Sequence, residues 1–190
     1  DHTADPAFIA ADLLAQAEHD PQALALALVT EPEQAPAIVA ELERQLPELP
    51  RADIARTALA ARGLILEVGG VAEAIELAND IAIEHLELQV AEPWQWLAKI
   101  RHAGAIFLGS WTPEAAGDYV AGPNHVLPTM GTARIASALG VETFLKKSSI
   151  ISYSREALIA DGDHIRRLAA LEGLTAHGNS VAVRLGKADR

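Results

Sequence analysis

Four short aliphatic runs alternate with longer helical patterns along the N-terminal part of the chain, and this rhythm restricts the fold more than any other feature. Each run is too short for a helix and is rich in Leu, Ile, Val and Ala, which is typical of buried strands. The predicted strands are 23–30 (ALALALVT), 63–68 (GLILEV), 85–90 (HLELQV) and 105–108 (AIFL). Strands that alternate with helices are joined by right-handed crossovers, so we predict an α/β protein with a parallel sheet flanked by helices.

Helical patterns fill the intervals between these runs. Asp5-Pro6 is a helix-start signal before the first helix, and 46–50 (LPELP) separates two others because proline ends a helix. The predicted helices are 7–18, 32–45, 51–61, 71–82 and 93–102. After Gly140 the strand pattern stops, and we expect a helix over 156–171 followed by a helix or short strand over 174–185. The sequence therefore predicts an α/β domain over 1–139 and a small, mainly helical appendage over 140–190.

The composition excludes several classes of function. A formal net charge of −11 argues against a nucleic-acid partner, because phosphate binding requires clustered Lys and Arg. No apolar run approaches the roughly 18 residues of a membrane span, so we expect a soluble protein with no membrane partner. Because the chain has no cysteine, nitrogen and oxygen atoms must hold any metal. The first residue is Asp rather than Met, and we expect the chain to be a piece of a longer protein.

One polar loop is the strongest candidate for a functional site. The run 117–128 (GDYVAGPNHVLP) combines Asp118, Tyr119, Asn124 and His125 with glycine and proline. A loop of this kind has few packing reasons to carry such side chains, although an ordinary polar loop remains an equal alternative. The loop follows the last predicted strand, and ligands of open parallel sheets bind beyond the carboxyl ends of the strands. We therefore expect the site at the carboxyl edge of the sheet.

Three further polar clusters stand out in this aliphatic chain. Gln16 and His19 lie three residues apart on a predicted helix, so their side chains share one face. Glu84 and His85 lie at the predicted junction of a helix and a strand, and an adjacent acid and imidazole can perform general acid–base chemistry. The last cluster is Glu172 with His177. Each cluster alone also fits a solvated helix end or a packing role. Together with the polar loop they indicate one zinc-centred site.

Five motifs, in order along nearly the whole chain, resemble histidinol dehydrogenases. They are 12–20 (DLLAQAEHD), 84–88 (EHLEL), 104–109 (GAIFLG), 117–129 (GDYVAGPNHVLPT) and 174–177 (LTAH). The resemblance implies an incomplete Rossmann-like sheet. It also implies a cytoplasmic, zinc-dependent enzyme of histidine biosynthesis, which oxidises L-histidinol through L-histidinal to L-histidine with two NAD per turnover.

The resemblance also implies roles for individual residues. His85 would be the general base that accepts the alcohol proton, and Glu84 would activate the water that adds to the aldehyde. The zinc ligands would be Gln16, His19, Asp118 and His177. The substrate contacts would be these four together with Glu84, Tyr119, His125 and Glu172. Two imidazoles and two oxygen donors leave coordination positions for the substrate, so zinc would act as an anchor.

The chain departs from this family in its coverage. Family members are much longer, and their N-terminal portion, which makes most of the NAD contacts, has no counterpart here. The sequence contains neither G-x-G-x-x-G after a strand nor G-x-x-x-x-G-K-[ST], so its own NAD-binding residues are unknown. The family forms a homodimer with exchanged C-terminal arms, so 140–190 would be the dimerisation arm, and Glu172 and His177 would complete the partner's site. A separate N-terminal chain is a further expected partner.

Two alternatives remain open at the level of sequence. One is a related enzyme that oxidises another polyol or amino alcohol, since the shape of the pocket cannot be read from the motifs. The other is a catalytically silent fragment that binds zinc or dimerises. Stoichiometric zinc without turnover, even when the N-terminal portion is supplied, would support the silent fragment.

Overall fold

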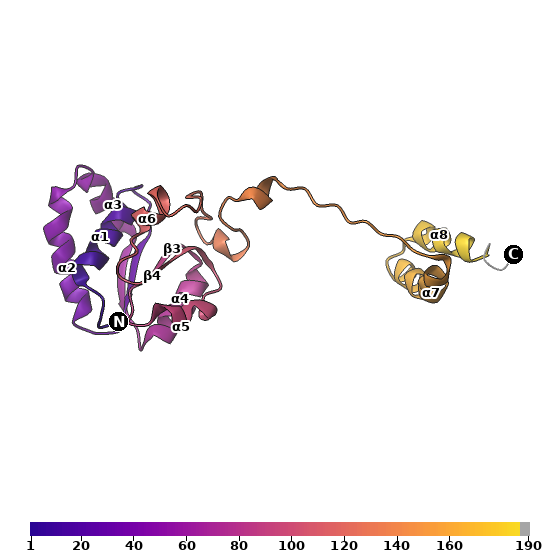
Figure 1. Cartoon of the computed structure of the whole chain (residues 1–190), viewed down its shortest axis with the longest axis horizontal. Helices are drawn as coiled ribbons and strands as arrows, with labels where there is room; N and C mark the ends of the chain where they lie inside the picture. The colour runs from indigo at the N-terminus through magenta and orange to yellow at the C-terminus, as the bar shows by residue number, and fades with distance from the viewer. Residues whose placement is uncertain (187–190) are drawn as a thin grey trace. The chain divides into compact units, whose positions relative to one another are not determined.

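The computed structural model describes residues 1–186 and divides the chain into two compact units, Asp1–Phe144 and Leu145–Arg190 (Figure 1). This division follows Leu139, the last residue of the expected α/β domain, by a few residues. The first unit contains all four strands and the second contains two helices. The α/β class and the helical C-terminal part are therefore confirmed.

The strands of the first unit form two separate parallel pairs. β1 (Ala25–Val29) pairs with β2 (Gly63–Glu67), and β3 (Ile83–Leu88) pairs with β4 (Ala103–Leu108). Ala25 lies opposite Gly63 in the first pair, and Ile83 lies opposite Ala103 in the second. The four strands are parallel within their pairs as predicted, but the described residues do not join them into a single sheet.

Helices lie on both sides of these strands (Figure 1). On one side are α1 (Pro6–Ala17), α2 (Gln34–Gln45) and α3 (Ala52–Arg62), and on the other are α4 (Val71–Ile81) and the short α5 (Pro93–Trp96). The last helix of the unit is α6 (Glu114–Tyr119). Single 3-10 turns, η1 to η4, complete the unit at Leu46–Glu48, Leu97–Lys99, Thr132–Arg134 and Val141–Phe144.

Small side chains form the main core of the first unit. The apolar face of α1 packs on β1, whose alternate residues Ala25, Ala27 and Val29 are buried. Ile38 of α2 and two alanines of α3 close the same cluster. Alanine on the facing surfaces allows the helices to approach the strands closely. Asp5 caps α1 by accepting the backbone N–H of Ala7, and Pro6 occupies the first turn as expected.

The helix predicted over 93–102 begins at Pro93 as expected but is shorter, because its α-helical part ends at Trp96. After α5 the chain makes only the η2 turn and then enters β4 at Ala103. The buried side chain of Asn79 accounts for this, because its Oδ1 accepts the backbone N–H groups of Arg101 and His102 at 2.7 and 3.2 Å. These bonds replace the helical partners of the two groups. The residues before β4 are thereby held in a non-helical form.

The second unit is a pair of packed helices, α7 (Arg155–Leu171) and α8 (Thr175–Gly186). Ser154 caps α7 by accepting the backbone N–H of Ala157. The helices cross closely at Gly162, where a Cβ atom would lie 2.7 Å from a methyl carbon of Leu185. The segment 174–185, for which helix and strand were both open, is therefore helical. Among the described residues, no helix has the length and apolar character needed to cross a bilayer.

Candidate active site

A cavity of about 580 Å³ in the first unit brings together six of the predicted site residues. They come from the end of α1, the start of β3, α6 and the segment that follows it. They are Gln16, His19, Glu84, His85, Asp118 and His125.

The cavity lies at the amino ends of β1 and β3, so the expectation of a site at the carboxyl edge is wrong. Its lining includes Ala23 and Leu24, directly before β1, and residues 81–85, where β3 begins. Although the polar loop leaves the carboxyl end of β4, α6 packs against α1 and brings the loop back to the end of that helix. The position of the site is thus set by α1 and α6 rather than by strand ends.

Two local expectations also need correction. Glu84 and His85 are the second and third residues of β3, rather than a helix–strand junction. Asp118 and Tyr119 lie in α6 rather than in an irregular loop, because Glu114 to Tyr119 form a helical turn after Pro113. Proline before the first turn is favourable for a helix start.

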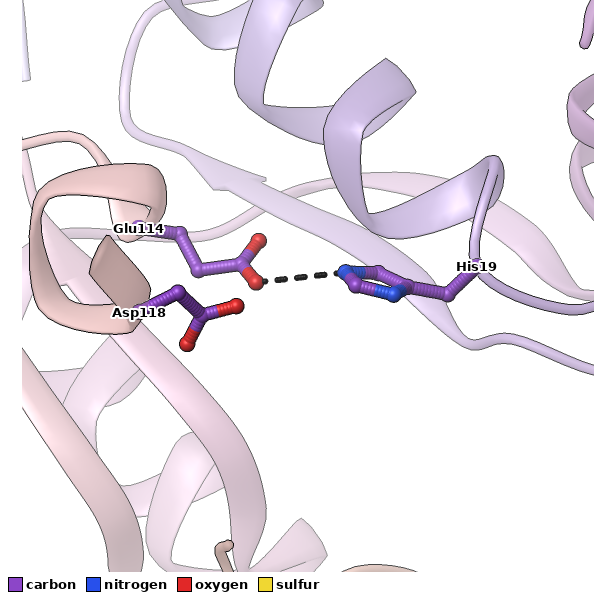
Figure 2. A group of neighbouring side chains, drawn as sticks. All are labelled: His19, Glu114 and Asp118. Atoms are coloured by element: carbon purple, nitrogen blue, oxygen red, sulfur yellow. Dashed lines mark hydrogen bonds and ion pairs between the residues drawn. The ribbon is translucent and has the colours of Figure 1, made fainter. Parts of the chain in front are cut away.

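His19, Glu114 and Asp118 form a group of donors that is close enough together to hold a metal ion. One donor atom from each lies within 4.8 Å of the others, and His19 Nε2 is 3.4 Å from Glu114 Oε1. Figure 2 shows both carboxylates leaving α6 and pointing toward the His19 ring. One imidazole and two carboxylates are donors that zinc accepts. The chemistry of the donors therefore fits a divalent zinc ion.

Glu114 was not identified from the sequence. In the structure its side chain is buried, with 4% exposure. It lies four residues before Asp118, a spacing that places both side chains on the same face of a helix. That signal is readable only if 114–119 is recognised as helical. Treating the segment as a loop concealed it.

His85 is held between an amide and a carboxylate. Its Nδ1 is 3.1 Å from Oε1 of Gln16, and its Nε2 is 3.6 Å from Oε1 of Glu114. Because an amide oxygen only accepts, this contact is a hydrogen bond in the tautomer of His85 that carries its proton on Nδ1. The buried Nε2 atom then has a free lone pair and no hydrogen-bond partner. This is the arrangement that a general base requires.

Glu84 carries a perturbed carboxyl group. Burial raises its pKa, and the negative charges of Glu114 and Asp118 act in the same direction, whereas His85 and His19 lower it. A carboxyl group with a raised pKa takes up a proton more readily than an exposed one. Glu84 is therefore suited to accept a proton from water.

A second layer of polar side chains ties together the elements that carry these groups. Glu87 of β3 accepts the backbone N–H of Glu114 at 3.1 Å, and Gln89 donates to both Glu87 and Asp12 of α1 at 3.0 and 2.8 Å. Burial, reinforced by Asp12, raises the pKa of Glu87 to about 8, and burial raises the pKa of Asp12 as well. This network links α1, β3 and α6, the three elements that position the candidate ligands and base.

The remaining predicted site residues are placed differently. Tyr119 is 82% exposed and does not line the cavity, whereas His125 lines it from an exposed position. Glu172 ends α7 and His177 lies in the first turn of α8, so both belong to the second unit, where both are exposed. Their participation in the site stays a prediction.

The comparisons with known proteins agree on one family. The sequence model of the family described as histidinol dehydrogenase matches residues 1–185. A histidinol dehydrogenase from Desulfotalea psychrophila is 70% identical over 185 residues, which are 97% of this chain and 43% of that protein. One from Nitratidesulfovibrio vulgaris is 56% identical over 184 residues, with 97% and 42% covered.

A solved structure gives the same result. The crystal structure of histidinol dehydrogenase from Elizabethkingia anophelis is similar at a TM-score of 0.86 and 36% identity, covering 99% of this chain and 43% of that one. The chain thus spans less than half the length of the relatives that it matches. With a family match over nearly its whole length and the same fold as a solved member, the chain belongs to the histidinol dehydrogenase family.

Proposed function

We propose that this chain carries the zinc- and substrate-binding part of an enzyme that oxidises L-histidinol through L-histidinal to L-histidine with NAD. The observation that carries this proposal is a metal-type donor group that lies beside a base. His19 and Asp118 line one cavity together with His85, the proposed base, and the carboxylate of Glu114 lies close to both histidine rings. Membership of the histidinol dehydrogenase family supports a role in histidine biosynthesis.

Gln16, His19 and Asp118 of the first unit would hold zinc. In the proposed homodimer, the fourth ligand would be His177 from the arm of the partner chain. Glu114 is a further candidate ligand, because its carboxylate lies beside His19 Nε2. When bound, zinc would anchor the imidazole and amine of the substrate. Glu114 also faces His85 Nε2, where its negative charge would stabilise the imidazolium once a proton has been accepted.

His85 and Glu84 would accept the protons that are released during the oxidation. NAD, when bound, would serve as the hydride acceptor for the alcohol carbon. His85 Nε2 would accept the hydroxyl proton, while Nδ1 keeps its hydrogen bond to Gln16. Water then adds to the aldehyde carbon and Glu84 accepts the proton that the water loses. A second NAD would supply the hydride acceptor for the oxidation of the hydrated aldehyde to the acid. His125 and Glu172 would contact the substrate, and Tyr119 would line the pocket of the assembled enzyme.

NAD would be bound mainly by the part of the family's length that this chain does not cover. We therefore expect the chain to bind zinc and histidinol but to turn over only when that part is supplied. This requirement distinguishes the proposal from a silent zinc-binding fragment, which would stay inactive even when the part is supplied. A relative that acts on another amino alcohol would turn over that alcohol in preference to histidinol.

Removing either proposed histidine ligand should abolish zinc binding. We expect purified His19→Ala and His177→Ala variants to lose stoichiometric zinc and, with it, zinc-dependent binding of histidinol, because each loses a donor from a site of few ligands. Metal analysis and calorimetric titration with histidinol measure both properties. His164→Ala is the matched control, since His164 is exposed on α7 and outside the proposed set. Zinc retained at full stoichiometry in both variants would contradict the proposed ligands.

The second unit is proposed as a dimerisation arm. Its two helices bury few side chains and leave many apolar ones exposed, including Ile159, Leu168, Leu171 and Val183. Exposed apolar surface on this scale is typical of an interaction site. In the proposed homodimer, Glu172 and His177 of the arm complete the partner's zinc site.

Chelation should weaken this homodimer, because ligands that are shared between chains couple metal binding to association. We expect sedimentation to show a shift from dimer toward monomer when EDTA is added, and recovery of the dimer when zinc is restored. The His164→Ala variant should behave like the unmodified chain. A dimer of equal strength with and without the chelator would exclude zinc ligands that are shared between chains.

A further inference from the structure

The helix α6, which carries Glu114 and Asp118, is too short to hold its own position. It has six residues, and helices of this length are marginal in water without tertiary contacts. Its N-cap residue, Pro113, makes no side-chain capping hydrogen bond. Both carboxylates nevertheless point toward the His19 ring (Figure 2). Contacts from outside the helix therefore place them.

Two residues that lie opposite each other in β3 and β4 support this helix. Glu87 and Phe107 are partners in the register of the strand pair, so their side chains leave the same face of it. Oε1 of Glu87 accepts the backbone N–H of Glu114 at 3.1 Å. The Phe107 ring lies against Gly117, where an added Cβ atom would be 2.7 Å from Cε1 of the ring. A hydrogen bond thus holds the start of α6, and close packing holds its middle.

Both supports are fixed by their own surroundings. Phe107 is buried, and its ring centroid lies 6.0 Å from that of His85. Gln89 donates to the carboxyl groups of both Glu87 and Asp12 at 3.0 and 2.8 Å. Burial and Asp12 raise the pKa of Glu87 to about 8, so its neutral form prevails at pH 7 and can donate to Asp12. The two strand residues therefore connect α6 with the proposed base and with α1.

Asp12 connects this support to the donors on α1. It lies four residues before Gln16, a spacing that places both side chains on one face of the helix. His85 and Glu87 share one face of β3, because the side chains of a strand alternate. Gln16 contacts His85 at 3.1 Å, and Asp12 hydrogen-bonds with Glu87. Two successive contacts thus fix how α1 lies on β3.

We propose that Glu87 and Gly117 are positioning residues of the metal site. Glu87 anchors the start of α6, and Gly117 allows the helix to approach Phe107 closely enough for its carboxylates to meet the donors of α1. This inference rests on the proposed function, in which His19 and Asp118 hold zinc. Neither positioning residue supplies a ligand, since both act through the placement of α6. Loss of such outer contacts typically lowers metal affinity by about 10–100-fold.

Removing the acceptor at Glu87 should weaken metal binding. We expect Glu87→Leu to lower the affinity of the purified chain for Co²⁺ by about 10–100-fold, measured by competition with a chelator. Glu87→Gln keeps an oxygen that can accept the N–H of Glu114, so its affinity should stay within about threefold of native. Ile38→Val is the control for lost stability, since Ile38 lies in the main core, and it should bind Co²⁺ as the native chain does. Equal losses in both Glu87 variants would overturn the role of this acceptor.

Gly117→Ala separates positioning from the local stability of α6. Alanine is a better helix former than glycine, so a role limited to helix stability predicts unchanged or tighter metal binding. The added Cβ atom does not fit against Phe107, so we expect an affinity for Co²⁺ that is lower by about tenfold or more, and a changed visible spectrum of the bound ion. Phe107→Leu removes the ring atoms that this Cβ atom would meet. The double variant should therefore recover most of the loss.

Hydrogen exchange of the metal-free chain tests the placement of α6 by itself. With EDTA present, we expect the amides at 114–119 to exchange faster by about tenfold or more in Glu87→Leu and in Gly117→Ala, because the helix loses a support. Amides of β1 and β2 should exchange as in the native chain. Native exchange at 114–119 in either variant would overturn the role of the residue concerned.

The two measurements distinguish failure of this inference from failure of the proposed function. A native chain that binds neither Co²⁺ nor Zn²⁺ would contradict the proposed metal site, and exchange in EDTA would still decide whether Glu87 and Gly117 place α6. If the native chain binds Co²⁺ and both variants bind it equally well, the positioning role is overturned and the metal site stands. An equal loss of affinity in Ile38→Val would assign the effect to stability and would also overturn the positioning role.

Discussion

Replacing His85 by Asn should lower histidinol turnover by about 10²–10⁴-fold when the chain is combined with the N-terminal portion of its Desulfotalea relative. Asn can still donate to Gln16 from the position of Nδ1, which is 3.1 Å from Oε1 in the native chain. It has no equivalent of Nε2, the atom with the free lone pair. The variant thus removes the proton acceptor and retains the contact that orients it. Reduced NAD, followed by its absorbance in single-turnover experiments, measures the rate of hydride transfer.

Two controls separate a catalytic effect from a structural one. His102→Asn changes a histidine whose side chain does not line the cavity, and it should leave turnover within a few-fold of native. Zinc content of the His85→Asn variant should stay stoichiometric, since His85 is outside the proposed ligand set. Turnover of the variant within tenfold of native would assign the proton to another group, with Glu84 the nearest candidate.

Stability of the first unit should fall as the pH rises from about 4.5 to about 8, through the Glu87 carboxyl group. Its pKa is raised from 4.5 to about 8 by burial and by Asp12. The native state therefore binds this proton more tightly than the unfolded state does. The resulting stabilisation is complete below the unfolded pKa and is lost as the pH passes the native one. After allowance for partial solvent screening, we expect roughly 2–4 kcal/mol across this range.

Glu87→Gln should remove this component of the pH dependence. The neutral amide can still accept the N–H of Glu114 and can donate to Asp12, while the hydrogen bond from Gln89 to Oε2 is lost, so most of the network is kept without a titrating group. Urea unfolding followed by circular dichroism at several pH values, with EDTA present, measures the effect. Glu43→Gln, at an exposed position on α2, is the control and should retain the native slope. Parallel slopes for Glu87→Gln and the native chain would exclude Glu87 as the source.

The predicted elements and the predicted site differ in how far sequence alone could determine them. Strands and helices were recognisable because apolar periodicity and helix caps are local, as at Asp5-Pro6 and in the run before Thr30. The helix predicted over 93–102 is shorter than expected because a side chain more than twenty positions away, Asn79, accepts the backbone N–H groups of Arg101 and His102. Glu114 was missed for a related reason, since its importance depends on contacts with His19 and His85.

By itself, the sequence determined the order of the elements, the family and a set of candidate residues, because propensity, capping and motifs are carried by neighbouring positions. Only the tertiary structure decided that the cavity with six of the candidate residues lies at the amino ends of the strands, and that Glu114 lies beside His19 and Asp118. It also decided which strands pair among the described residues, β1 with β2 and β3 with β4. Each of these depends on distances between residues far apart in the chain. Such distances are set by the packing of α1, α4 and α6 around the strands, and that packing is a property of the whole unit.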